Sequence, residues 1–265
     1  MPRIAIGQYY PANSPIHSLD PRFKLVCSFT FIIMLFFITS APGYVVAACF
    51  IAVSIKVSTV PLSFILRSLR AIFILLLFTV ALNMFFMPGG DLVFRLGFIS
   101  VYTEGLSRAA MMGSRLILLI FSSSLLTLTT SPIDLTGAIE FVLTPLKKLR
   151  VPAAEIAMMM TIALRFIPTL VEEMDKIMKA QKARGADFET GGIVKKARSL
   201  IPLLIPLFIS AFRRADELAM AMEARCYRPD APRTRMKIMR LTQRDFAALG
   251  IAAAFFGLIL ATRYF

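Results

Sequence analysis

Long apolar runs separated by short polar turns dominate the pattern along the chain. These runs cover residues 25–39, 44–60, 71–87, about 105–128 and 246–260. An apolar helix of about 20 residues crosses the hydrocarbon core of a bilayer, so the pattern predicts about five transmembrane helices. Between the fourth and fifth runs, apolar and charged positions alternate at helical spacing, which predicts amphipathic helices outside the hydrocarbon core.

Three segments follow from this pattern, within an all-α integral membrane protein. Residues 1–130 would hold an amino-terminal segment and four transmembrane helices. Residues 131–240 would form a cytosolic domain of amphipathic helices, and residues 241–265 would contain the last transmembrane helix. Residues 92–102 alternate loosely, and the pattern leaves open whether they form a short strand or an interfacial segment.

Composition and charge agree with a multi-pass membrane protein. Hydrophobic residues make up 57% of the chain, and the mean hydropathy is +0.73. A net charge of +14 raises the question of nucleic acid, but most Lys and Arg residues lie between Pro145 and Arg244, interleaved with acidic residues. We interpret this asymmetry as the positive-inside rule, with no nucleic acid as partner. Arg22 and Lys24 at the start of the first run then place the amino terminus in the cytoplasm.

Motifs of common enzymes are missing from the sequence, which predicts a chain with no catalytic residue, no metal site and no cofactor of its own. It contains no GxxxxGK[ST] phosphate loop, no GxSxG and no HExxH, and Cys27, Cys49 and Cys226 are scattered. A lipid-modifying membrane enzyme and a stand-alone carrier are rival classes. Only Arg115 suggests the mid-membrane charge of a carrier, and we favour a structural role for it. Glu172, Glu173 and Asp175 are interpreted as a solvated or partner-facing surface.

Two similar helix ends stand out in the amphipathic region. Ala183-Arg184-Gly185 and Ala224-Arg225-Cys226 each close an Ala- and Met-rich run. Both arginines fall in or near the last turn of a helix, where the helix dipole favours a cation, and this ordinary role explains either one alone. The recurrence of a small-Arg-small ending favours a second interpretation, in which each guanidinium enters a pocket on a partner protein.

Five motifs together resemble the transmembrane T component of energy-coupling factor (ECF) transporters. They are SLDPRFKL at residues 18–25, TSPID at 130–134, IALRFIP at 162–168, AQKARG at 180–185 and ELAMAMEAR at 217–225. Their order and spread make the resemblance extend over nearly the whole chain. The residues Gly7-Gln8-Tyr9-Tyr10-Pro11 and the chain length resemble the shared, or group II, type. A T component dedicated to cobalt, nickel or biotin is the alternative.

The resemblance implies a scaffold in the bacterial plasma membrane that serves vitamin uptake. Two ABC-type ATPase subunits, A and A′, would use ATP, and a substrate-binding S component would carry the vitamin inward. Ala183, Arg184, Gly185, Ala224, Arg225 and Cys226 correspond to the family's two motifs that dock into grooves on the ATPases. Glycine is usual at the position of Cys226, and the difference implies either slower helix termination or a tighter docking groove.

Overall fold

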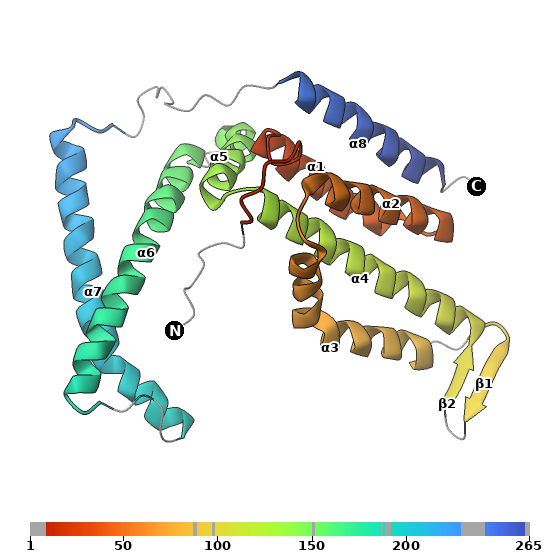
Figure 1. The fold of residues 1–265 in the computed structure, drawn as a ribbon, viewed down its shortest axis with the longest axis horizontal. Helices are drawn as coiled ribbons and strands as arrows, with labels where there is room; N and C mark the ends of the chain where they lie inside the picture. Colours follow the sequence, from red (N-terminus) through yellow and green to blue (C-terminus); the bar gives the residue numbers. More distant parts are fainter. Residues whose placement is uncertain are drawn as a thin grey trace. The chain divides into compact units, whose positions relative to one another are not determined.

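The computed structural model is mainly helical (Figure 1). It describes residues 9–86, 89–96, 99–149, 152–186, 188, 192–228 and 242–262. Within these residues the helices are α1 (Pro21–Phe37), α2 (Ala41–Ser58), α3 (Leu62–Phe86), α4 (Thr103–Thr129), α5 (Pro132–Leu143), the 3-10 helix η1 (Thr144–Leu149), α6 (Ala153–Ala183), α7 (Ile193–Ala224) and α8 (Gln243–Ala261). The predicted helical membrane fold is confirmed.

A two-stranded antiparallel hairpin lies between α3 and α4. It pairs β1 (Leu92–Leu96) with β2 (Ile99–Tyr102), and a register shift lies between Leu92 and Phe94. The segment that the sequence left undecided is therefore a pair of strands.

Five helices in the described part of the chain have the length and apolar composition of membrane spans, as predicted. They are α2, α3, α4, α6 and α8. This set differs from the predicted runs in one helix. The first predicted run lies in α1, which has only 17 residues, whereas α6 has 31 residues and begins with a long apolar stretch. The chain is a multi-pass membrane protein.

The backbone packs into two compact units. The first comprises Met1–Val142 and Met239–Phe265, and the second comprises Leu143–Ile238. Compactness is a different criterion from position relative to a bilayer, so the predicted segment boundaries after residues 130 and 240 stay predictions.

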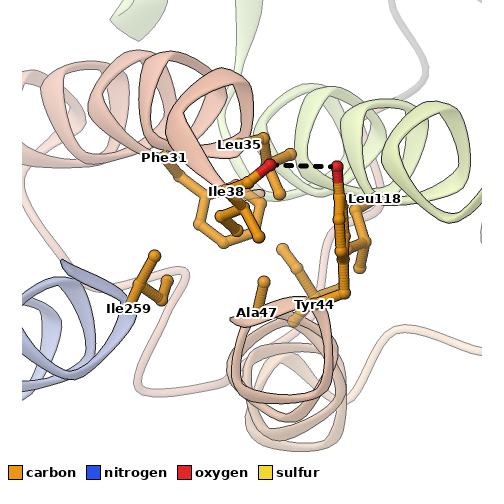
Figure 2. Packing of buried hydrophobic residues seen from close by; sticks show 8 residues of the cluster. Phe31, Leu35, Ile38, Tyr44, Ala47, Leu118 and Ile259 are labelled. Carbon is orange, nitrogen blue, oxygen red and sulfur yellow. Dashed lines mark hydrogen bonds between the residues drawn. The ribbon is translucent and has the colours of Figure 1, made fainter. Parts of the chain in front are cut away.

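The core of the first unit lies where α1, α2, α4 and α8 meet (Figure 2). Its buried members are Phe31, Leu35, Ile38, Tyr44, Ala47, Ile51, Leu118 and Ile259. Lipid is as apolar as these side chains, so close van der Waals packing rather than transfer from water holds such helices together. Gly43 allows a close approach, because a Cβ at this position would lie 2.8 Å from Cγ2 of Ile38 and 2.9 Å from Oγ1 of Thr262.

Arg115 of α4 stabilises the carboxyl end of α1. Its Nη2 donates to the carbonyl oxygen of Ile38, the C-cap of α1, at 3.1 Å. The Tyr44 hydroxyl donates to the same oxygen at 3.5 Å, the contact drawn in Figure 2. The guanidinium also lies 5.6 Å from the centre of the Phe36 ring. A cation is favourable at this end of a helix, which supports the structural role favoured for Arg115.

Lys24 joins the amino-terminal segment to the end of α4. Its side chain is buried, and Nζ donates to the carbonyl oxygens of His17 and Thr129, each at 3.0 Å. Tyr10 adds a backbone hydrogen bond of 2.9 Å to the Leu128 carbonyl oxygen. Three carbonyl groups that would otherwise lack partners are satisfied in this way.

Asp245 joins the starts of α1 and α8. Its Oδ1 accepts from the backbone N–H of Asp20 at 2.8 Å, and its Oδ2 accepts from the backbone N–H of Thr242 at 2.7 Å. Asp20 in turn caps α1 by accepting from the backbone N–H of Arg22. The capping interactions of two helices far apart in the sequence therefore form one network.

His17 is partly buried in the amino-terminal segment, where its carbonyl oxygen accepts from Lys24. Burial lowers the pKa of His17 below its usual value of 6.5. Its Nε2 donates to the Tyr10 carbonyl oxygen at 3.0 Å, and its Nδ1 hydrogen bonds with the Ser14 hydroxyl at 2.7 Å. These contacts give the histidine a structural role in the folded amino-terminal segment.

Replacing Arg115 tests its capping role. Arg115→Leu removes a charged hydrogen bond to the C-cap of α1, so we expect a loss of about 1.5–3 kcal/mol in the free energy of unfolding. The change would be measured as a lower thermal unfolding midpoint in detergent. Arg108→Leu is the matched control, because Arg108 pairs with Glu104 on the exposed surface of the same helix and its loss costs about 0.5 kcal/mol or less. Equal midpoints for the two variants would contradict the capping role.

Candidate functional site

The second unit is built on an antiparallel pair of long helices, α6 and α7 (Figure 1). Each helix has the amphipathic pattern that the sequence predicted. Two prolines, Pro202 and Pro206, lie inside α7, and each removes a backbone hydrogen bond and favours a bend.

Glu173 of α6 makes the polar contact where the two helices cross. Its carboxylate accepts from the Ser210 hydroxyl at 2.5 Å and pairs with the Arg214 guanidinium at 3.2 Å. Both partners belong to α7. The sequence interpretation of Glu173 as part of a solvated or partner-facing surface is therefore wrong for this residue, because its carboxylate faces the neighbouring helix. Glu172, next to it, is exposed.

The carboxyl end of α6 closes with a Schellman motif. Arg184 is the C-cap, and Gly185 follows in the left-handed conformation with φ +85°. The N–H of Gly185 donates to the carbonyl oxygen of Lys182, and that of Ala186 donates to the carbonyl oxygen of Gln181. This pair of bonds satisfies the last carbonyl groups of the helix through the backbone alone.

The carboxyl end of α7 closes in the same way, although it lacks glycine. Arg225 is the C-cap, and Cys226 takes the left-handed conformation with φ +54°. The N–H of Cys226 donates to the carbonyl oxygen of Glu223, and that of Tyr227 donates to the carbonyl oxygen of Met222. Cys226 therefore ends α7 with the same hydrogen bonds as Gly185 ends α6, in a conformation that is unfavourable for a side chain with a Cβ.

All six residues of the two motifs are exposed. They are Ala183, Arg184, Gly185, Ala224, Arg225 and Cys226. Within the described residues, neither arginine has an ion pair or a side-chain hydrogen bond. Because the backbone already satisfies the helix ends, both guanidinium groups keep their five donors for another molecule.

The structure does not bring the two arginines together. The helices run in opposite directions, so Arg184 and Arg225 lie towards opposite ends of the pair (Figure 1). Arg184 lies eleven residues beyond Glu173, and Arg225 lies eleven residues beyond Arg214. At 1.5 Å per residue, each motif stands about 16 Å along its helix from the crossing contact. The two motifs therefore present separate contact points.

An apolar face of α7 is exposed as well. It includes Ile201, Leu204, Ile205, Phe208 and Phe212, which recur at the three- and four-residue spacing of one helix face. Phe212 is 67% exposed. An apolar face of this size requires either lipid or a partner protein to cover it.

The described part of the chain holds no cluster of metal-ligating side chains. No group of three or more His, Cys, Asp or Glu side chains there is placed to hold a metal ion.

Comparisons with known proteins agree on one family. The family model described as "CbiQ: Cobalt transport protein" matches residues 12–238. The chain is 56% identical over 246 residues to the energy-coupling factor transporter transmembrane protein EcfT of Clostridium kluyveri, covering 92% of this chain and 91% of the relative. It is 51% identical over 261 residues to the protein of the same name from Ruminiclostridium cellulolyticum, covering 98% and 97%. For the EcfT protein of Thermosediminibacter oceani the identity is 55% over 248 residues, covering 94% and 93%.

Replacing the left-handed residue at the end of each helix tests the motif geometry. Cys226→Gly relieves an unfavourable left-handed residue, and Gly185→Ala introduces one at a position where the new Cβ meets no atom within 4 Å. We expect the last turn of α7 to become more stable and that of α6 to become less stable, each by about 1 kcal/mol. Amide hydrogen exchange at residues 186 and 227 measures both turns. Changes of the same sign in the two variants would contradict the shared motif.

Proposed function

Because the chain belongs to the EcfT family, the transmembrane proteins of energy-coupling factor transporters, we propose that it couples ATP hydrolysis in two ABC-type ATPase subunits to uptake of a vitamin through an S component. The chain itself is a transporter component and works in a complex with other subunits. In this proposal ATP binds only to the partner ATPases, and this chain carries no cofactor.

The two exposed arginines carry the proposal. Each stands at a helix end that is already satisfied by its own backbone, so its guanidinium is available to a partner. A groove lined by carboxylates or carbonyl groups matches the planar set of donors. Since Arg184 and Arg225 occupy opposite ends of the helix pair, one ATPase subunit binds each end.

The crossing contact supports transmission of motion between these ends. Glu173, Ser210 and Arg214 fix the point where α6 and α7 meet. Closure of the two ATPases on ATP moves the docked ends, and the helices turn about this contact as stiff bodies. The exposed apolar face of α7, which includes Phe208 and Phe212, contacts the S component and passes the motion to it.

Membrane orientation follows from the positions of the partners. ATP is cytoplasmic, so the ends of α6 and α7 lie on the cytoplasmic side of the bacterial plasma membrane. The amino terminus lies on the same side, in agreement with Arg22 and Lys24 at the start of α1 and with the excess of Lys and Arg after residue 145.

Substrate selection belongs to the S component in this proposal. The chain acts as a shared, group II T component that serves several vitamin-specific S components. A component dedicated to cobalt is the second candidate, because the matching family model is that of a cobalt transport protein. Genomic position beside a single S component gene would separate the two.

Charge reversal of the two arginines tests docking. Arg184→Glu and Arg225→Glu each replace a docked cation by an anion, and we expect each to weaken its contact by about 2–5 kcal/mol. The two contacts act as a bivalent attachment, so single variants retain part of the ATPase and the double variant retains none. Co-purification of both ATPase subunits with a tagged chain from membranes measures this. Arg213→Glu, an exposed change on α7, is the control, and undiminished ATPase recovery by the double variant would overturn the docking role.

Neutralising Glu173 tests transmission separately from docking. Glu173→Gln removes the ion pair with Arg214 at the crossing and leaves both helix ends unchanged. We expect normal ATPase recovery and a several-fold fall in substrate taken up per ATP hydrolysed, measured in vesicles with the reconstituted complex. Glu172→Gln changes the exposed neighbour and provides the control. If uptake per ATP is the same for both variants, the crossing contact does not transmit motion.

A further inference from the structure

A cavity of about 370 Å³ lies inside the first unit, bounded by α1, α2, α4, α8 and residues 15–19. This volume falls in the range of pockets that hold small ligands. It lies within the first unit, so the docking motifs of α6 and α7 take no part in it.

The serine hydroxyls that line the cavity all have partners within the protein. Ser28 and Ser122 hydrogen bond to each other at 3.2 Å, and the Ser54 hydroxyl donates to the Phe50 carbonyl oxygen at 2.8 Å. The remaining walls there are apolar side chains, among them Phe31 and Phe50. A ligand in this part of the cavity is therefore a hydrocarbon, because a polar molecule would lose its hydrogen bonds to water without replacement.

Aromatic rings line part of the cavity, and one side of it is open. Phe31 and Phe50 line the cavity, and Phe256 packs against both rings, with ring centres 5.4–6.4 Å apart in this group. On the open side, Val53 of α2 is 51% exposed and Ile251 of α8 is 58% exposed. Both residues belong to helices with the composition of membrane spans, so this side faces lipid and admits a chain from the bilayer.

Cations gather at the opposite, polar end of the cavity. Lys24 lines it with a buried ammonium group that uses two of its three donors on the carbonyl oxygens of His17 and Thr129. The carboxylates of Asp134, Asp245 and Asp20 lie near enough to offset its charge. Arg244 at the start of α8 lines it as well, with an exposed side chain. Within the described residues, no carboxylate lies within ion-pair distance of Arg244. Arg244 is therefore the cation available to an anion at this end, and Lys24 adds one hydrogen-bond donor.

We propose that this cavity is a phospholipid site, in which one acyl chain fills the apolar interior and the lipid phosphate binds Arg244 and Lys24. Apolar walls and a cationic mouth match the two parts of such a lipid, and the multi-pass membrane position supplies it. The bound chain fills a void between α1, α2, α4 and α8 that their own side chains leave open. This site does not depend on the proposed coupling function.

Filling the cavity tests the acyl-chain part of the proposal. Ala252 lines the cavity and is buried, whereas Ala253 is exposed and does not line it. The full-length chain, purified in mild detergent, is titrated with phosphatidylglycerol and bound lipid is counted by native mass spectrometry. We expect one tightly retained lipid for the wild type and for Ala253→Phe, and none for Ala252→Phe. Equal retention by both variants would overturn the site.

A surface change tests the phosphate part without altering the packing. Arg244→Gln keeps the helix start and removes the charge, and we expect at least tenfold weaker retention of phosphatidylglycerol. Lys56→Gln removes an exposed cation of α2 outside the cavity and should leave retention unchanged. Inorganic phosphate at the same concentrations should not displace the lipid. Unchanged retention by Arg244→Gln, or displacement by phosphate alone, would overturn the proposed binding mode.

Discussion

Backbone groups at a helix end need hydrogen-bond partners, and inside a bilayer no water can supply them. The first unit meets this need with side chains. Arg115 binds the last carbonyl group of α1, Lys24 binds a carbonyl group at the end of α4, and Asp245 binds the starts of α1 and α8. The second unit meets it with the backbone, through Schellman motifs at the ends of α6 and α7. Cations therefore serve as internal caps in one unit and remain free at the helix ends of the other.

This contrast explains what the sequence could reveal about the site. The triplets at residues 183–185 and 224–226 are local, and helix termination depends on a few neighbouring residues, so a single sequence is enough to place both arginines at helix ends. Their exposure and opposite directions depend on how α6 and α7 pair, which no local pattern contains. The contact between Glu173 and Arg214 joins residues 41 positions apart, and neither residue differs in type from its exposed neighbours.

The number of membrane spans could be predicted for a similar reason, but the full set of helices that form them could not. Hydropathy over about 20 residues depends on composition alone, which is why α2, α3, α4 and α8 match the predicted apolar runs. Arg115 has the same sequence signature whether it lines a transport path or caps a helix, and only the Ile38 carbonyl oxygen distinguishes the two. The cavity beside Ser28 and Ser122 had no sequence signal at all, because a void is a property of packing.

The equal spacing of the two arginine motifs from the crossing contact has a mechanical meaning. Eleven residues separate Glu173 from Arg184 on the α6 arm, and eleven separate Arg214 from Arg225 on the α7 arm. Equal rotations of the two helices about their crossing would therefore displace their ends by equal distances. Side chains along the arms are free to vary, but insertion of even one residue would rotate the motif by about 100° around its helix. The length of each arm is therefore under stronger constraint than its composition.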